Sequence, residues 1–409
     1  MGRLRYNRES FGYTVSFPDG RMGLYAHEVA PLLVDGVSHE DIARYRLETI
    51  HIDTDFHLNA PLIVWIELTR KCNLRCRHCY VGAGEPMEGE LSTQELCLLL
   101  EDLKGMKALS LVITGGEPTL HKDFAHILRY ACELGFVVSI ATNGLPLTQE
   151  GLDQLPGTYE DLRVNVSLDG AGQYNPLRGE VSFKQITDKL LLLKDNGILT
   201  AVMAALSSRN IDGMRKIFEW CVEHEIVFRT GLFSPLGRGG EGENRGFTLN
   251  PGDVEKASSL WLDETLFEME MNKSIGACVA KIFDYTFELD YSTKRCKGGR
   301  SLAYVCANGD VYPCSICAAT STFKAGNLRE KKFSEIWQDS FHEIRGFTWG
   351  DFKDCDRCEL SRGSYFCTNR CPPLGLRYRG SPSACGALPV HKMILKKRTE
   401  LLHQALGVS

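Results

Sequence analysis

Six short β-rich runs alternate with helical patterns between residues 62 and 235, and this alternation constrains the fold more than any other feature. Helical patterns such as HKDFAHILRYACELG separate several of the runs, and three of these patterns close on Gly, a normal helix stop. Strands that alternate with helices favour a parallel α/β sheet. The predicted strands are LIVWIEL (62–68), LSLVIT (109–114), FVVSIAT (136–142), LRVNVSL (162–168), TAVMAAL (200–206) and IVFRTGLF (226–233).

Polar and glycine-rich segments follow five of these strands. In chain order they are RKCNLRCRHCYVGAGEP (70–86), Thr114-Gly115-Gly116-Glu117-Pro118, Thr142-Asn143-Gly144, Ser167-Leu168-Asp169-Gly170 and SPLGRGGEGENRG (234–246). The carboxyl ends of parallel strands meet at one rim of the sheet, and ligands of α/β folds bind there. The sequence therefore predicts an active site at this rim.

Sixteen cysteines in 409 residues are the outlier of the composition. Three lie at 72–79 and nine between 296 and 385, whereas Cys97, Cys132, Cys221 and Cys278 are scattered through apolar segments. The length and the polar N-terminus, without a secretory signal or an apolar membrane span, indicate a cytoplasmic protein, in which clustered thiols favour metal ligands over disulfides. The net charge of −5 argues against a nucleic-acid partner.

The loop after the first strand holds Cys72, Cys76 and Cys79 in the pattern Cys-x₃-Cys-x₂-Cys. A structural zinc or an ordinary iron–sulfur cluster takes four protein ligands. One interpretation is a zinc site completed by His78 or a distant residue. The sharper interpretation is a [4Fe–4S] cluster held by three thiolates, whose remaining iron is open to a substrate.

The three-cysteine loop, followed by GGEP after the next strand, resembles the radical S-adenosylmethionine (SAM) superfamily. The resemblance implies a partial (β/α)₆ barrel, and a cluster whose open iron is chelated by SAM, which is then cleaved to a 5′-deoxyadenosyl radical. It also implies a set of SAM contacts, although the last three residues of the set could equally be ordinary turn or surface residues. The candidates are Gly115, Gly116, Glu117, Pro118, Asn143, Ser167 and Arg178.

The C-terminal cysteines resemble the SPASM extension of this superfamily, as does the hairpin LAYVCANGDVYPC with its Asn308-Gly309 turn. The resemblance implies two auxiliary [4Fe–4S] clusters and hence three clusters in all. The first takes Cys296, Cys314 and Cys371, with Cys306 and Cys317 competing for the fourth place; the second takes Cys355, Cys358, Cys367 and Cys385. Strand alternation puts Cys306 and Cys314 on opposite faces, which favours Cys317. Cys367 departs from the usual spacing, and zinc knuckles are the alternative for the region.

Auxiliary clusters can accept the electron that a substrate radical gives up, so the resemblance implies a net oxidation. SPASM proteins act most often on peptides, and we expect a ribosomally made precursor peptide as substrate, an external flavodoxin- or ferredoxin-type electron donor, and room for a small leader-recognition protein. Ser315 stands where sulfatase maturases have an Asp, which counts against formylglycine formation. The alternatives are oxidation of a non-peptide small molecule and, outside enzymes, an iron–sulfur electron-transfer protein.

The chain divides into five segments on these patterns. They are an N-terminal hairpin and helix unit that either contacts a leader peptide or caps the barrel (1–55), a radical SAM barrel core (56–248), a helical bridge (249–295), a SPASM domain (296–390) and a C-terminal helix (391–409).

Overall fold

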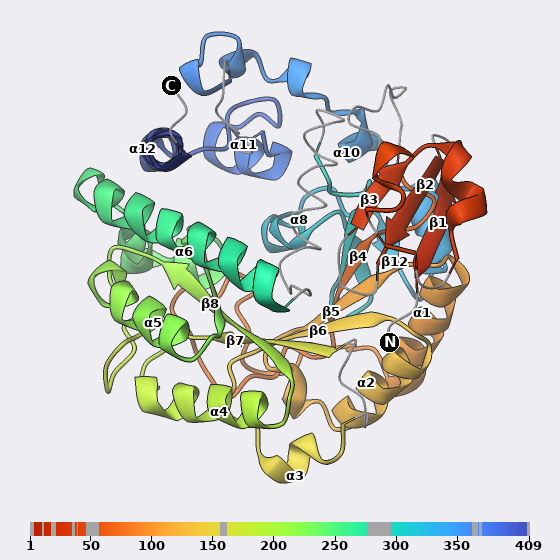
Figure 1. The fold of residues 1–409 in the computed structure, drawn as a ribbon, viewed down its shortest axis with the longest axis horizontal. Helices are drawn as coiled ribbons and strands as arrows, with labels where there is room; N and C mark the ends of the chain where they lie inside the picture. Colours follow the sequence, from red (N-terminus) through yellow and green to blue (C-terminus); the bar gives the residue numbers. More distant parts are fainter. Residues whose placement is uncertain are drawn as a thin grey trace.

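The computed structural model describes residues 4–9, 12–17, 22–34, 37–38, 40–45, 57–155, 162–275, 296–361, 367 and 370–406. Its centre is a sheet in the order β12-β11-β10-β4-β5-β6-β7-β8-β9, which curves with helices along its outside (Figure 1). The six strands expected from the sequence all form, as parallel neighbours in chain order, and the predicted partial (β/α)₆ barrel is confirmed. They are β4 (Ile63–Glu67), β5 (Ser110–Thr114), β6 (Val137–Thr142), β7 (Leu162–Ser167), β8 (Leu199–Leu206) and β9 (Val227–Leu232).

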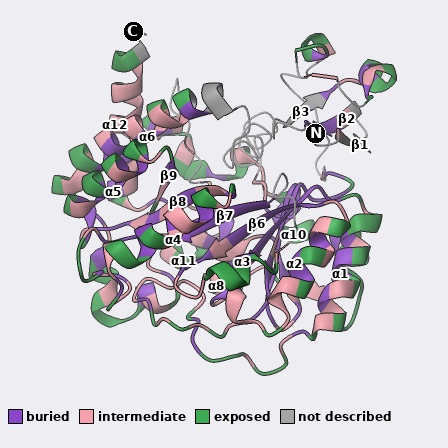
Figure 2. Ribbon diagram, turned by 60° about the horizontal axis from the view of Figure 1, so that its bottom comes forward, coloured by how far each residue is buried: buried purple, intermediate pink, exposed green. Residues whose placement is uncertain are grey.

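The helices that follow these strands cover the outer face of the sheet. They are α1 (Thr93–Gly105), α2 (Phe124–Glu133), α3 (Gln149–Leu152), α4 (Phe183–Asp195) and α5 (Ile211–Glu223). Ser92 and Ser182 start α1 and α4 with capping boxes, in which the serine and the third helical residue satisfy each other's backbone N–H groups. The strands are largely buried and the outer helix faces exposed (Figure 2).

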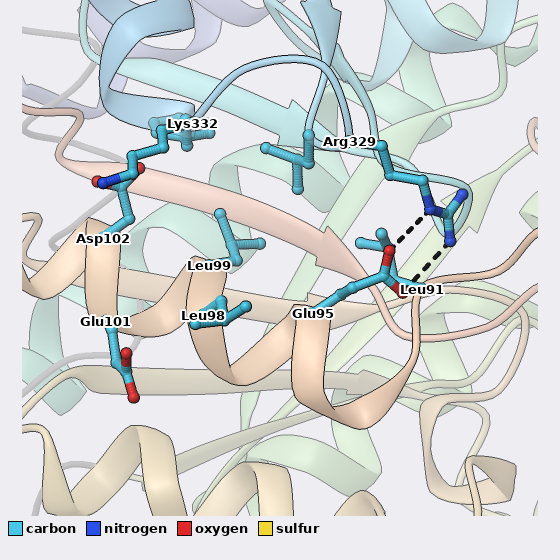
Figure 3. Close-up of a pocket in the computed structure, with 10 residues that line it drawn as sticks. Leu91, Glu95, Leu98, Leu99, Glu101, Asp102, Arg329 and Lys332 are labelled. Carbon is cyan, nitrogen blue, oxygen red and sulfur yellow. Dashed lines mark hydrogen bonds and ion pairs between the residues drawn. The ribbon is translucent and has the colours of Figure 1, made fainter.

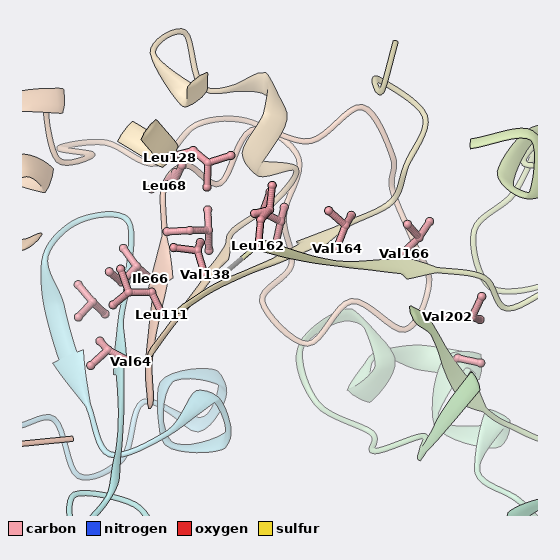
Figure 4. Packing of buried hydrophobic residues seen from close by; sticks show 14 of the residues in the cluster. Val64, Ile66, Leu68, Leu111, Leu128, Val138, Leu162, Val164, Val166 and Val202 are labelled. Carbon is pink, nitrogen blue, oxygen red and sulfur yellow. The ribbon is translucent and has the colours of Figure 1, made fainter. Parts of the chain in front are cut away.

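Alternate strand residues point toward these helices and make one apolar core. Val64 and Ile66 of β4 belong to it, as do Val164 and Val166 of β7 (Figure 4). Because side chains alternate along a strand, the residues between them lie on the opposite face, which we call the inner face of the sheet.

The predicted SPASM hairpin forms from β10 (Leu302–Val305) and β11 (Asp310–Tyr312), with β12 (Gly326–Asn327) beside it. Gly309 has φ +85° in its turn, a conformation that suits glycine. From the sequence we expect this hairpin in a separate SPASM domain. In the structure β10 pairs in parallel with β4, from Leu302 opposite Ile63 to Val305 opposite Ile66. The barrel sheet and the C-terminal hairpin are therefore one sheet.

The remaining helices complete the C-terminal half. They are α6 (Val254–Ile275), α8 (Ser315–Thr320), α9 (Phe333–Asp339), α10 (His342–Gly346), α11 (Pro372–Arg379) and α12 (Pro389–Leu406). The predicted helical bridge begins with a capping box at Asn250, on a short 3₁₀ turn (Pro251–Asp253) that leads into α6. The bridge beyond residue 275, including Cys278, lies outside the described residues. No helix in the described part of the chain is both long and apolar enough to cross a membrane.

The N-terminal segment forms a three-stranded antiparallel sheet of β1 (Arg5–Glu9), β2 (Gly12–Ser16) and β3 (Met22–Tyr25). The sequence predicts only the β2–β3 hairpin, whose turn at residues 18–20 lies outside the described residues. The helical part expected in this segment consists of two 3₁₀ turns, η1 (His27–Leu32) and η2 (Ala43–Tyr45). This unit has its own small core, including Val15, Tyr25 and Ile42.

Candidate functional site

The GGEP loop packs against the start of the three-cysteine loop. The backbone N–H of Gly116 donates to Thr69 O at 2.7 Å and that of Glu117 donates to Lys71 O at 2.8 Å. A Cβ on Gly116 would lie 2.3 Å from Lys71 O, and Gly115 has φ +146°. Besides any contact with the cofactor, these glycines allow the two loops to approach each other closely.

Glu117 is fully buried and its carboxylate ties its own loop to the end of β6. It accepts hydrogen bonds from the hydroxyls of Thr119 (2.6 Å) and Thr142 (2.7 Å) and from the backbone N–H of Asn143 (2.8 Å). Burial raises the pKa of Glu117, and these hydrogen bonds oppose the rise. The predicted contact with the cofactor ammonium stays a prediction, and the carboxylate also holds the Asn143 turn in place.

Asn143 and Ser167, both predicted cofactor contacts, end neighbouring strands. The amide nitrogen of Asn143 donates to Asn73 Oδ1 at 2.7 Å and lies 4.0 Å from Cys72 Sγ. The hydroxyl of Ser167 makes no hydrogen bond to another described residue. The structure thus brings Asn143 next to the three-cysteine loop.

Arg178 is held by a carboxylate that the sequence analysis does not assign to the site. Asp169 is fully buried, accepts from Arg178 Nε, and accepts from the backbone N–H of Ala205 at 2.6 Å. Arg178 Nη1 lies 3.7 Å from Cys76 Sγ, so a cation faces one of the three thiols. The pattern SLDG at a strand end was the available signal for Asp169.

His78 contacts Arg178 and Asp169 through Nε2, while its Nδ1 is buried without a hydrogen-bond partner among the described residues. The Nε2 atom lies 3.4 Å from Arg178 Nη2 and 3.5 Å from Asp169 Oδ2. Burial lowers the pKa of His78 to about 4, so the ring is neutral near pH 7. Burial likewise raises the pKa of Cys76 to about 11.

The glycine-rich loop after β9 clamps the three-cysteine loop. Arg238 donates through its guanidinium to the carbonyl oxygens of Cys76 (3.0 Å), Gly82 (3.3 Å) and Ala83 (2.8 Å). Its backbone N–H donates to Cys79 O at 3.1 Å, and a Cβ on Gly237 would lie 2.2 Å from Tyr80 O. The sequence places this loop at the rim but does not identify the role of Arg238.

A buried polar network joins the three-cysteine loop to the C-terminal hairpin. The fully buried Glu67 at the end of β4 accepts from Arg70 Nε (2.5 Å), from the hydroxyl of Tyr304 on β10 (2.6 Å) and from the backbone N–H of Ala307 (3.1 Å). The hydroxyls of Tyr304 and Tyr80 are 3.4 Å apart. We call Glu67, Arg70, Tyr80 and Tyr304 the junction network.

The four thiols favoured for the first auxiliary cluster lie together. Cys314 Sγ is 3.6 Å from Cys317 Sγ, and their hydrogen bond lowers the pKa of Cys314 to about 7. Burial raises the pKa of Cys371, with the charges of Cys296 and Cys314 adding to the rise. Cys306 packs in the same small cluster as Cys314 and Cys317, but its pKa is raised to about 12 by burial and then by the charge of Glu67. The structure therefore brings Cys317 to the other three thiols, with Cys306 close by on the side of Glu67.

The second auxiliary set gathers around Cys355. Burial raises the pKa of this thiol, Arg370 opposes the rise, and Cys367 and Cys385 add to it, so the thiols of all three lie close together. The backbone N–H of Cys358 donates to Cys355 O at 3.1 Å. The long gap before Cys367 does not keep it away from the set, although the ligand role of each cysteine stays a prediction.

The donor sets fit iron–sulfur clusters in kind, since thiolates are the usual ligands of such clusters. Within the described ranges, no three or more His, Cys, Asp or Glu side chains are arranged to hold a single metal ion. A cavity of about 630 Å³ lies between α1 and residues 328–333, where Arg329 and Glu95 pair at 2.7 Å (Figure 3). None of the predicted cluster or cofactor residues lines it, so its volume does not mark the site.

Comparison with known proteins agrees with this geometry. Residues 66–221 match the family model described as the radical SAM superfamily, and residues 296–359 match the SPASM iron–sulfur cluster-binding domain. The fold is similar to that of Streptococcus suis SuiB bound to precursor peptide SuiA, with a TM-score of 0.69, 17% identity, and coverage of 95% of this chain and 98% of that chain.

Two curated relatives bear different names. An AdoMet-dependent heme synthase of Methanosarcina barkeri is 28% identical over 312 residues, which cover 70% of this chain and 85% of that protein. The mycofactocin maturase MftC of Mycolicibacterium smegmatis is 29% identical over 302 residues, which cover 70% and 73% of the two chains. The two matched domains, the barrel and the placement of the cysteines agree, and the chain is a radical SAM protein with a SPASM domain.

Proposed function

We propose that this chain is a radical SAM peptide maturase, which oxidises a residue of a ribosomally made precursor peptide to form a cross-link or to modify its backbone. The observation that carries the proposal is the N-terminal three-stranded sheet, which offers an extended peptide a place to bind. The similarity to a maturase and the fold shared with a peptide-bound protein support it.

The N-terminal sheet is anchored on one side and open on the other. Asn7 of β1 donates through its amide to Lys107 O at 2.9 Å, just beyond the end of α1, and Glu9 accepts from the backbone N–H of Asn59 at 2.9 Å. The strand order places β3 at the far edge, where no further strand pairs with it among the described residues. A leader peptide can add there by main-chain hydrogen bonds.

The three-cysteine loop and the rim around it have separate tasks in this proposal. Cys72, Cys76 and Cys79 would hold a [4Fe–4S] cluster, which when bound supplies the electron for reductive cleavage of SAM to a 5′-deoxyadenosyl radical. The loop 115–118 with Asn143 and Ser167 would bind SAM and orient it. Arg178, beside Cys76, would offset thiolate charge as well as reach the cofactor carboxylate.

The C-terminal thiols would complete the oxidation. Loss of a hydrogen atom and then of an electron makes a two-electron oxidation of the substrate, and the second electron needs an acceptor. Two further clusters would provide it, and an external flavodoxin- or ferredoxin-type protein would exchange electrons with the enzyme. The proposed ligands are Cys296, Cys314, Cys317 and Cys371 for one cluster and Cys355, Cys358, Cys367 and Cys385 for the other.

Oxidation of a small non-peptide molecule is the second candidate, because relatives named heme synthases match as much of this chain as the maturases do. A substrate of this kind would not need the N-terminal sheet. The open edge of β3 favours the peptide.

The test uses anaerobically reconstituted protein and the short peptides encoded beside its gene. We expect about twelve iron atoms for three clusters, SAM cleavage with dithionite, and a mass change in one peptide. Deleting residues 1–55 should abolish the mass change and spare SAM cleavage, because no proposed cluster or SAM ligand precedes Cys72. A truncated enzyme that still modifies the peptide at full rate would contradict the role of the sheet.

A further inference from the structure

Asn165 lies in the middle of β7 on the inner face of the sheet. Its neighbours along the strand, Val164 and Val166, are buried in the core against the outer helices. Because side chains alternate, Asn165 points to the opposite side, away from those helices.

The amide oxygen of Asn165 is buried without a hydrogen-bond partner among the described residues. The residue is 6% exposed, and its Oδ1 is a buried acceptor that no described donor reaches. A buried acceptor without a donor lowers the stability of a fold, so such groups are rare and call for an explanation. A ligand that donates a hydrogen bond would supply one.

Small residues flank Asn165 across the sheet. In the strand register it pairs with Ala141 of β6 and with Ala201 of β8. Neither methyl group can donate to the amide or reach across it. Ser167 lies one pleat further along β7, and Ser139 lies one pleat before Ala141 on β6; the hydroxyls of both make no hydrogen bond to described residues. We call Ser139, Asn165 and Ser167 the polar stripe on β6 and β7; the buried Arg163 lies beside it, opposite Ser139.

The depth of Asn165 separates it from the predicted SAM contacts. Ser167 lies two residues nearer the carboxyl end of β7, a distance of about 7 Å along a strand. Asn143 follows the end of β6, next to Cys72. Asn165 therefore lies deeper in the barrel than the rim where the cofactor is proposed to bind.

We propose that Asn165 is a specificity-determining residue whose Oδ1 accepts a hydrogen bond from an amide N–H of the peptide substrate. The inference rests on the proposed peptide maturation and names a contact for it. The unpartnered atom is an acceptor, so carboxylate or phosphate oxygens cannot satisfy it, whereas a main-chain or carboxamide N–H can.

A substrate contact of this kind has a signature that a structural amide lacks. Asn165→Leu keeps the shape and removes the unsatisfied acceptor, so we expect an unchanged or higher urea midpoint of unfolding. The same variant should lose at least about ten-fold in kcat/KM for the peptide identified in the modification assay, mainly through KM. Its SAM affinity should match that of the wild type. Asn165→Asp, which keeps an acceptor, should recover part of the loss.

Ser110→Ala is the matched control, because the buried Ser110 hydroxyl on β5 is already satisfied by donating to Leu62 O at 2.7 Å. It should lower the midpoint and leave peptide kinetics unchanged. A lower midpoint with normal peptide kinetics in Asn165→Leu would make Asn165 structural, and weaker SAM binding would assign it to the cofactor. Normal kinetics in that variant overturn this inference alone, whereas a wild type that modifies no peptide overturns the proposed function with it.

Discussion

The junction network and the polar stripe on β6 and β7 are both buried and polar, yet their hydrogen bonding differs. At the junction, Glu67 accepts three hydrogen bonds, one of them from the cation of Arg70. On the stripe, Asn165 Oδ1 accepts none. Hydrogen bonds within the protein offset the cost of burying Glu67, whereas no such bond offsets the cost of burying Asn165 Oδ1.

This difference in hydrogen bonding distinguishes buried groups that stabilise the fold from buried groups that are available to bind a ligand. A satisfied buried network fixes the positions of its members, here the cysteine loop relative to β10. An unsatisfied buried group is costly to stability and persists where function requires it. The comparison therefore predicts opposite responses to mutation in the two regions.

The largest effect is expected at the junction. Glu67→Ala leaves the buried Arg70 cation without its carboxylate, and removing one partner of a buried ion pair costs about 3–5 kcal/mol. The free energy of unfolding in urea should fall by this amount, in contrast to the neutral Asn165→Leu. A fall below about 1 kcal/mol would show that the two regions do not differ as described.

Arg238→Ala sharpens the comparison at the other side of the cysteine loop. Three carbonyl oxygens lose a charged donor, so the free energy that holds the three-cysteine loop in place should fall by about 2–3 kcal/mol. Iron from the reconstituted protein should pass to a chelator faster. Arg75→Ala is the matched control on the same loop, because its ion pair with Glu85 is largely exposed and should contribute little. Equal iron loss in both variants would contradict the clamp.

Glu264 tests a buried carboxylate at the opposite edge of the sheet. It accepts from Thr230 on β9, and burial raises its pKa to about 7. The protonated form is favoured in the fold, so its contribution is present below the unfolded value near 4.5 and is lost as pH rises through 7. The stability advantage of Glu264→Gln should grow by about 2 kcal/mol between about pH 5.5 and 8. A constant difference across that range would refute the assignment.

The smallest effect belongs to the outer member of the junction network. Tyr80→Phe removes a hydroxyl that lies 3.4 Å from the Tyr304 hydroxyl, a long contact expected to contribute about 0.5–1 kcal/mol. Tyr304→Phe should cost more, because that hydroxyl also donates to Glu67 at 2.6 Å. If Tyr80→Phe lowered the free energy of unfolding in urea more than Tyr304→Phe does, Tyr80 and not Tyr304 would be the central residue of the network.

The sequence predicts the barrel well because its signals are local. The apolar runs and helix stops mark β4 to β9 within a residue or two, and the Asn308-Gly309 turn marks the C-terminal hairpin. The four thiols favoured for the first auxiliary set lie close together, as do those of Cys355, Cys367 and Cys385 in the second. These features depend on residue type and separation alone.

The contacts between distant segments could not be predicted in this way. Nothing in GRGGEGENRG says that Arg238 reaches the carbonyls of residues more than 150 positions earlier, and nothing in LAYV says that β10 joins β4. The sequence also gives no sign that Asn165 Oδ1 lacks a donor, because the residue type and its neighbours in the strand are the same whether or not a donor faces it. These properties depend on the register and on the far side of the fold.

The parallel pairing of β10 with β4 means that the two matched domains cannot be exchanged as independent modules. A chain ended at residue 295 would leave the backbone N–H and C=O groups of β4 exposed along a sheet edge. Such edges recruit strands from other molecules and lead to aggregation. Engineering that transplants the barrel should therefore carry residues 302–305 with it, and a chimaera that replaces the C-terminal part must supply a strand in the same register.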